Sequence, residues 1–273
     1  MTGNTKENPH EEKMPVLFIG HGSPLNLILK NNFTRSLSKL GKNLPRPKAI
    51  MVISAHWLTE GTSVSCMEKP RTIYDFYGFP DELYEMEYPS PGSPGYAGFV
   101  KESIQKAQVK CSTDWGLDHA SWAVLRHMYP EADIPVFEMS LDYSFNEWHP
   151  KPIRYHYELA SELAGLRERG VLIIGSGNIV HNLGLIDFGN IDAKPYDWAV
   201  EFDEEVKYNL LNNNHKELIN FQEMKGAALS VPTLDHYLPM IYAMALQVKN
   251  EPLKFTYEGF HYGSISMRCF QIG

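Results

Sequence analysis

The sequence is poor in cysteine, in long apolar runs and in positive charge, and each shortage excludes a class of protein. Only three of its 273 residues are cysteine, without a C-x-x-C pair, so neither a disulfide framework nor a thiolate zinc site is indicated. No stretch reaches the roughly 18 apolar residues of a membrane span, and the first residues lack the apolar core of a signal peptide. The formal net charge of -8 argues against nucleic acid or an anionic membrane surface as the main partner. We therefore expect a cytoplasmic protein with a small-molecule ligand, and because no heptad seam is present we favour a monomer.

Apolar runs alternate with helix-like stretches along the chain, which is the pattern of a layered α/β domain. Strands are expected at 15–19, 49–54, 134–139 and 171–174, and helices at 34–40, 95–108, 122–128, 153–169, 198–211 and 237–247. Residues 264–270 alternate in polarity, which predicts an antiparallel strand at the edge of the sheet. The predicted fold is a single α/β domain with a central mixed β-sheet flanked by helices. It spans residues 14–273 and follows a flexible N-terminal tail at residues 1–13.

Three histidines, His21, His56 and His181, each come just after or at the end of an apolar run that is typical of a strand. In open α/β sheets, ligands gather outside the carboxyl ends of the strands, so imidazoles at several such ends can converge. Imidazole is a common metal ligand, and the pattern therefore indicates a metal site. For His56 the structural alternative is a core histidine with a satisfied hydrogen bond, and for His21 it is a capped turn before a helix.

Two further histidines stand at predicted helix starts. His236 follows Asp235, which is a candidate N-cap, and such a position can hold a ligand rigidly. His119 lies between Asp118 and Ser121, which are either cap residues or groups that orient a site. The glycines near His181 do not follow the G-x-G-x-x-G spacing and no lysine follows them, so nucleotide binding is not indicated.

The segment 72–89 carries six aromatic residues without a regular period. Aromatic side chains on an irregular segment need a surface to cover. The segment either packs over the main core or forms an aromatic wall over a pocket for a flat ligand. In the second interpretation, Tyr74, Phe76 and Tyr77 contact the substrate.

Six ordered motifs together resemble the 4,5-DOPA extradiol dioxygenase family, which belongs to the class III extradiol ring-cleavage group. They are residues 20–24 (GHGSP), 54–57 (SAHW), 74–80 (YDFYGFP), 118–122 (DHASW), 178–182 (NIVHN) and 235–239 (DHYLP). The resemblance spans nearly the whole chain and implies metal ligands at His21, His56 and His236. It implies that His181 is the active-site base, or a fourth ligand when zinc is bound. His119 corresponds to a position that helps to hold substrate or oxygen.

By this resemblance the reaction opens a catechol ring such as that of L-DOPA with O2, at a mononuclear Fe(2+) site. Zn(2+) suits the same imidazoles, so we expect purified protein to carry zinc and to be inactive in that form. Many non-haem iron oxygenases use two histidines and a carboxylate instead, and Asp235 and Glu258 remain alternatives to His236 as the third ligand. Two other functions stay open at this point: a zinc-dependent hydrolase or lyase, and a non-catalytic metal- or aromatic-binding protein.

Overall fold

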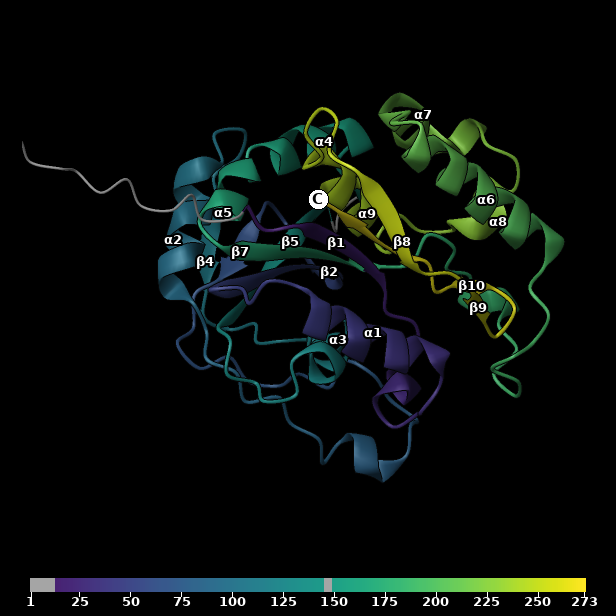
Figure 1. Ribbon diagram of the computed structural model, residues 1–273, viewed down its shortest axis with the longest axis horizontal. Helices are drawn as coiled ribbons and strands as arrows, with labels where there is room; N and C mark the ends of the chain where they lie inside the picture. The colour runs from purple at the N-terminus through teal and green to yellow at the C-terminus, as the bar shows by residue number, and fades with distance from the viewer. Residues whose placement is uncertain (1–12, 145–148) are drawn as a thin grey trace, which may run out of the picture.

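The computed structural model describes residues 13–144 and 149–273, and all but Lys13 of the tail expected at residues 1–13 lies outside them. Nine strands form one sheet in the order β4-β3-β5-β2-β7-β1-β11-β8, with β6 paired to β5 (Figure 1). Neighbours among β5, β2, β7 and β1 are parallel, whereas β11 runs antiparallel to β1 and to β8. The prediction of a single α/β domain with a central mixed sheet is confirmed. The strands of the large sheet are β1 (Val16–Gly20), β2 (Ala49–Thr59), β3 (Ser63–Ser65), β4 (Lys110–Ser112), β5 (Val136–Ser144), β6 (His149–Pro150), β7 (Val171–Gly177), β8 (Leu253–Tyr257) and β11 (Cys269–Ile272).

Helices cover both faces of the sheet, and each face has its own core. Along β1, Val16 and Phe18 pack into one core while Leu17 and Ile19 pack into the other, because successive side chains of a strand point to opposite faces. Helices α1 and α3 lie on one side of the sheet, and α4, α5 and α9 lie on the other (Figure 1). The α-helices are α1 (Asn32–Asn43), α2 (Pro94–Ser103), α3 (His119–Met128), α4 (Ile153–Ser161), α5 (Ala164–Glu168), α6 (Asp197–Leu211), α7 (His215–Ile219), α8 (Ala227–Ser230) and α9 (Leu238–Ala245). In the described residues, no helix combines the length and the apolar character that a membrane crossing would need.

Three predictions about elements were wrong in detail. The helix expected at 95–108 ends earlier, because α2 stops at Ser103. The helix expected at 153–169 is divided into α4 and α5 by a turn at Glu162 and Leu163. The strand expected at the sheet edge from 264–270 is divided as well. Its first part, β10 (Ile265–Ser266), pairs with β9 (Phe260–His261) in a separate sheet, and β11 is flanked by β1 and β8. The half-exposed β8 forms the edge of the large sheet instead. Its residues do not alternate clearly between buried and exposed positions, so no strand was predicted there.

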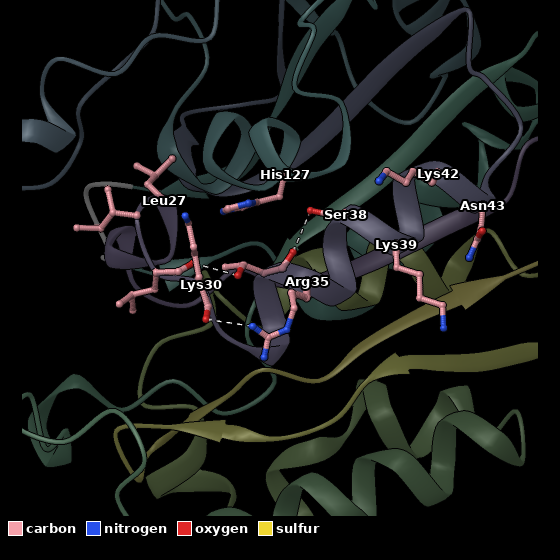
Figure 2. A pocket seen from close by; sticks show the side chains of 11 residues that line it. Leu27, Lys30, Arg35, Ser38, Lys39, Lys42, Asn43 and His127 are labelled. Atoms are coloured by element: carbon pink, nitrogen blue, oxygen red, sulfur yellow. Dashed lines mark hydrogen bonds between the residues drawn. The ribbon is translucent and has the colours of Figure 1, made fainter.

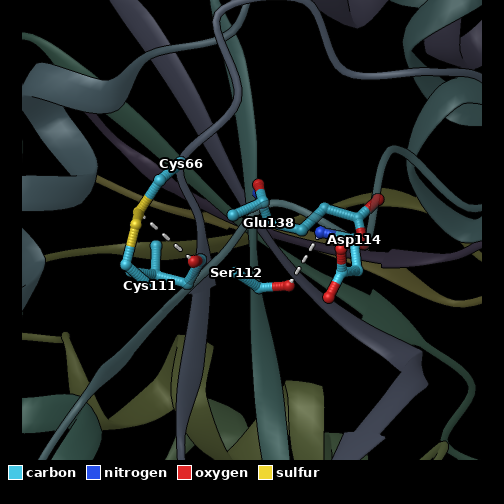
Figure 3. The surroundings of a disulfide bond; sticks show 7 residues. Cys66, Cys111, Ser112, Asp114 and Glu138 are labelled. Atoms are coloured by element: carbon cyan, nitrogen blue, oxygen red, sulfur yellow. Dashed lines mark hydrogen bonds between the residues drawn. A yellow bond between two sulfur atoms is a disulfide. The ribbon is translucent and has the colours of Figure 1, made fainter.

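A disulfide joins Cys66 to Cys111 at the outer edge of the sheet (Figure 3). The absence of a C-x-x-C pair indicated no disulfide, and this expectation was wrong, because the two cysteines are 45 residues apart and only the fold brings them together. They meet because β3 pairs in parallel with β4, which places Val64 beside Cys111. Their Cα atoms are 5.7 Å apart, within the usual range for a disulfide, while Cys269 is free and buried.

The glycines of β7 permit a close approach of the chain that enters α9. A Cβ atom on Gly175 would lie 2.2 Å from the carbonyl oxygen of Pro239, and one on Gly177 would lie 2.2 Å from that of His236. The amide of Asn178 also donates to the His236 carbonyl over 2.9 Å. The glycine-rich run before His181 is therefore explained by packing, and it fixes the position of the segment that carries His236.

We expect Gly175→Ala to lower the free energy of unfolding by about 1–3 kcal/mol, because the added methyl group forces β7 and α9 apart. The matched control is Gly165→Ala in α5, where a Cβ would meet nothing within 4 Å. A helical alanine there should stabilise the protein by up to about 1 kcal/mol. Urea denaturation measures both variants, and equal stabilities would contradict the packing argument.

Candidate metal centre

Five histidines gather at the carboxyl edge of the parallel strands. His21 follows β1, His56 lies in the last part of β2, and His181 follows β7 after a short loop. His236 precedes α9, and His119 is the first residue of α3. The ring centroids of His21, His56 and His236 lie 5.0–5.3 Å apart, so two histidines at strand ends and one before a helix bring their imidazoles together.

The geometry of His21, His56 and His236 fits a single metal ion. One ring nitrogen of each lies within 4.8 Å of the others, and the two Nε2 atoms of His21 and His56 are 3.2 Å apart. Two nitrogens that bind one tetrahedral ion at about 2.1 Å would be separated by roughly 3.4 Å. The Nε2 atom of His236 is buried and has no hydrogen-bond partner in the described part of the chain. A buried nitrogen without a partner is costly, and a metal ion would satisfy it.

The other ring nitrogen of each histidine is held by a neighbouring side chain. The hydroxyl of Ser176 donates to the Ala120 carbonyl over 2.6 Å, so its oxygen accepts from Nδ1 of His21 over 3.1 Å. Nδ1 of His56 lies 3.1 Å from Oδ2 of Asp75. Nδ1 of His236 bonds to Asp235, which therefore orients that ring and is not a helix cap. These contacts fix the rings and leave the Nε2 atoms for a metal.

Asp75 is the residue of this site that sequence reasoning missed. Its Oδ2 also accepts from Nδ1 of His119 over 2.9 Å, and its Oδ1 accepts from the backbone amide of His119 over 2.9 Å. Burial raises the pKa of this carboxyl, but the hydrogen bonds from His119 and His56 outweigh burial and hold the pKa well below its usual range. The carboxylate therefore stays ionised. Asp75 lies in the motif at residues 74–80, where the prediction of substrate contacts rested on the aromatic residues. Its hydrogen bonds to His56 and His119 join segments far apart in the sequence, so no local pattern indicated them.

A second cluster, made of His56, Asp75 and His119, also has metal-binding atoms within 4.8 Å of one another. It has the composition of the two-histidine, one-carboxylate site of many iron oxygenases. Its short contacts, however, join Nδ1 atoms to the carboxylate, which is the geometry of hydrogen bonds from both rings. The geometry therefore favours His21, His56 and His236 as the ligand set and Asp75 as the group that orients His56 and His119.

The ring of His181 stacks on that of His236, with centroids 3.5 Å apart and an interplanar angle of 6°. Its backbone amide donates to the Ser230 carbonyl over 2.9 Å, which anchors the loop after β7. Burial, then the charge of His236, lowers the pKa of His181 well below its ordinary value. Burial likewise lowers the pKa values of His21 and His236. These imidazoles are therefore neutral near pH 7 and have lone pairs to offer.

The predicted aromatic residues occupy three different settings. Phe76 is buried and its ring lies edge-on to His119, with centroids 5.7 Å apart. Tyr74 packs against Trp122 and Phe76, and its hydroxyl donates to the Met86 carbonyl over 2.8 Å. Tyr77 is 92% exposed. The segment thus packs over the core, and of the three side chains Phe76 is the one with a ring contact to the histidine cluster.

Two other carboxylates have different roles. Glu258 bonds to Arg268 and to Lys207, whose Nζ lies 2.7 Å away, so it belongs to a separate ion-pair network. Glu138 in β5 is fully buried, and its carboxyl oxygens accept from the Asp118 amide and from Nε1 of Trp115, both over 2.9 Å. Burial, then the charge of Asp118, raises its pKa well above the ordinary value. It holds the segment that leads into His119, and no sequence pattern marked it.

Known proteins resemble this chain over most of its length. Residues 18–266 match the family described as the catalytic LigB subunit of aromatic ring-opening dioxygenase. A protein of Escherichia coli K12 named "4,5-DOPA dioxygenase extradiol" is 46% identical over 96% of this chain and 95% of its own length. A protein of Mirabilis jalapa with the same name is 36% identical over 85% of this chain and 86% of its own.

A crystal structure of an uncharacterized protein from Escherichia coli K12 has the same fold. It superposes with a TM-score of 0.82 at 43% identity, over 95% of this chain and 100% of that one. Members of this family depend on a metal, and the cluster of histidines is the candidate site for it. The chain therefore belongs to the family of the catalytic LigB subunit of aromatic ring-opening dioxygenases and is an extradiol dioxygenase, an oxidoreductase.

Proposed function

We propose that this enzyme opens the ring of a catechol such as L-DOPA with O2, at one ferrous ion held by Nε2 of His21, His56 and His236. The proposed catalytic domain spans residues 14–273. The observation that carries the proposal is the convergence of three imidazoles, each oriented through its Nδ1, on one point at the sheet edge. The names of the E. coli and Mirabilis jalapa relatives support the choice of substrate class.

When bound, ferrous iron supplies the redox chemistry that lets dioxygen react with an electron-rich diol, and it acidifies the coordinated hydroxyls. Three neutral ligands leave the full charge of the cation in the site, which favours a catecholate anion over a neutral diol. The same donors suit zinc, which has no redox chemistry, so we propose that zinc occupies the site in protein purified without added iron.

His181 is proposed as the general base. It is neutral near pH 7, and its ring lies against that of His236, so it is adjacent to the proposed metal position. It takes a proton from a catechol hydroxyl as the substrate binds and returns a proton when the ring opens. It is not among the three histidines whose nitrogens cluster within 4.8 Å, which supports its role as a base over a role as a ligand.

His119 and Phe76 are proposed to position the substrate. His119 donates from Nδ1 to Asp75, which turns its Nε2 toward the reactants as a hydrogen-bonding group. Phe76 contacts His119 edge-on and offers an apolar surface beside a planar ring. Asp75 links these two roles, because it also orients the proposed ligand His56.

The proposed reaction is tested by oxygen uptake with L-DOPA after anaerobic loading with ferrous iron, and zinc-loaded protein is the control. We expect oxygen consumption and a yellow ring-opened product with iron, and neither with zinc. Turnover of an ester or another hydrolysable substrate by the zinc form, without oxygen uptake by the iron form, would instead favour a zinc hydrolase.

Replacing His181 with phenylalanine keeps an aromatic ring against His236 but removes the base. We expect kcat for oxygen uptake to fall by about 10²- to 10⁴-fold, with the iron content unchanged. His215→Phe on α7 is the matched control and should leave kcat unchanged. Loss of iron from the His181 variant would show that His181 is a ligand, and unchanged kcat would remove it from the mechanism.

Replacing Asp75 with asparagine removes the charge that holds His56 and His119. We expect iron affinity to fall by about 10- to 100-fold, because a ligand histidine loses its orienting carboxylate. Asp133→Asn changes the charge by the same amount at an exposed ion pair with Arg46 and is the control. A competition titration with a metal chelator measures the affinity, and equal values for the two variants would count against the role of Asp75.

A further inference from the structure

A groove lined by basic side chains runs beside α1 and is separate from the histidine cluster. It has a volume of about 680 Å³, is open to solvent and is bounded by the 3-10 helix η1 (Pro24–Leu27), by α1 and by His127 of α3. Figure 2 shows Lys30 and Leu27 at one end, Lys42 and Asn43 at the other, and His127 opposite Ser38. This volume is typical of small-molecule sites.

The charge of the groove differs from that of the rest of the protein. Lys30, Arg35, Lys39 and Lys42 line it, and among the described lining residues there is no aspartate or glutamate. The surrounding sequence is equally one-sided: residues 13–59 contain seven lysines or arginines and no acidic residue, although the chain as a whole has 33 acidic and 25 basic residues. A local excess of this kind attracts anions.

Three of the basic side chains lie along one helix, and hydrogen bonds hold one of them in place. Arg35, Lys39 and Lys42 recur at intervals of one helical turn, so they lie on the same side of α1. The guanidinium of Arg35 donates to Oδ1 of Asn32 over 2.7 Å and to the Lys30 carbonyl over 3.2 Å, which are neutral acceptors that leave its charge uncompensated. In the described residues, no ion pair joins Lys30, Lys39 or Lys42 to a carboxylate.

The wall opposite the lysines is held by hydrogen bonds. Nε2 of His127 bonds to the Asn26 carbonyl over 2.8 Å, and Asn31 caps α1 by accepting from the Thr34 amide over 2.9 Å. Leu27 and Ile28 add apolar surface to the same groove. The groove therefore combines several cations with an apolar wall.

We propose that this groove binds a small organic molecule with two or more phosphate groups. Lysine ammonium groups bind phosphate as compact point charges, and several along one helix match several phosphates in one molecule. The apolar side chains at Leu27 and Ile28 contact its organic part. The volume of the groove, about 680 Å³, lies in the range of small-molecule sites, and the proposal does not depend on the reaction proposed above.

The test is calorimetric titration of ADP into chelator-treated full-length protein, so that phosphate cannot bind to a metal. We expect saturable one-to-one binding that is stronger than that of adenosine or inorganic pyrophosphate. The double variant Lys39→Glu, Lys42→Glu should weaken it about tenfold or more. The matched control, Lys101→Glu with Lys216→Glu, makes the same change of charge at exposed positions on α2 and α7 and should bind as the wild type does.

If the double glutamate variant fails to fold, as judged by circular dichroism, Lys39→Ala with Lys42→Ala takes its place. Failure of ADP to bind, or equal affinity in groove and control variants, would overturn the proposal. Binding of an acidic peptide or a DNA duplex through these lysines, without binding of ADP, would replace the small molecule with a macromolecular partner.

Discussion

The site depends on one constraint: several imidazoles must be buried close together while they stay neutral and correctly turned. Burial lowers the pKa values of His21, His181 and His236, so that like charges do not accumulate at the sheet edge. Orientation comes from hydrogen bonds to Nδ1, and Asp75 supplies one to His56 and one to His119. A carboxylate buried without those two donors would be costly, so the acid and the histidines stabilise one another.

The backbone around the site serves the same arrangement. The missing side chains at Gly175 and Gly177 let β7 touch the segment that carries His236, and this contact places an imidazole from the last third of the chain beside those of β1 and β2. On the opposite flank, the carboxylate of Glu138 holds the segment before α3 and with it His119. The packing of β7 thus positions His236, and the buried hydrogen bonds of Glu138 position His119.

Much of the fold and part of the site could be predicted from the sequence, and the difference has a physical basis. The central strands were predictable because they are buried on both faces and read as continuous apolar runs. The histidines were recognisable because they follow such runs. Asp75, Glu138 and the Cys66–Cys111 disulfide depend on pairings between distant segments, which no local pattern encodes. The net charge of -8 likewise concealed the basic groove beside α1, because an average says nothing about where charges gather.

The central claim is that one metal ion is bound by His21, His56 and His236. Anomalous diffraction from crystals loaded anaerobically with ferrous iron, recorded on both sides of the iron absorption edge, tests it most directly. We expect a single iron peak about 2.1 Å from the Nε2 atoms of these three histidines, with Asp75 still bonded to Nδ1 of His56 and His119. An iron peak coordinated by His56, Asp75 and His119, or no ordered iron at either cluster, would contradict it.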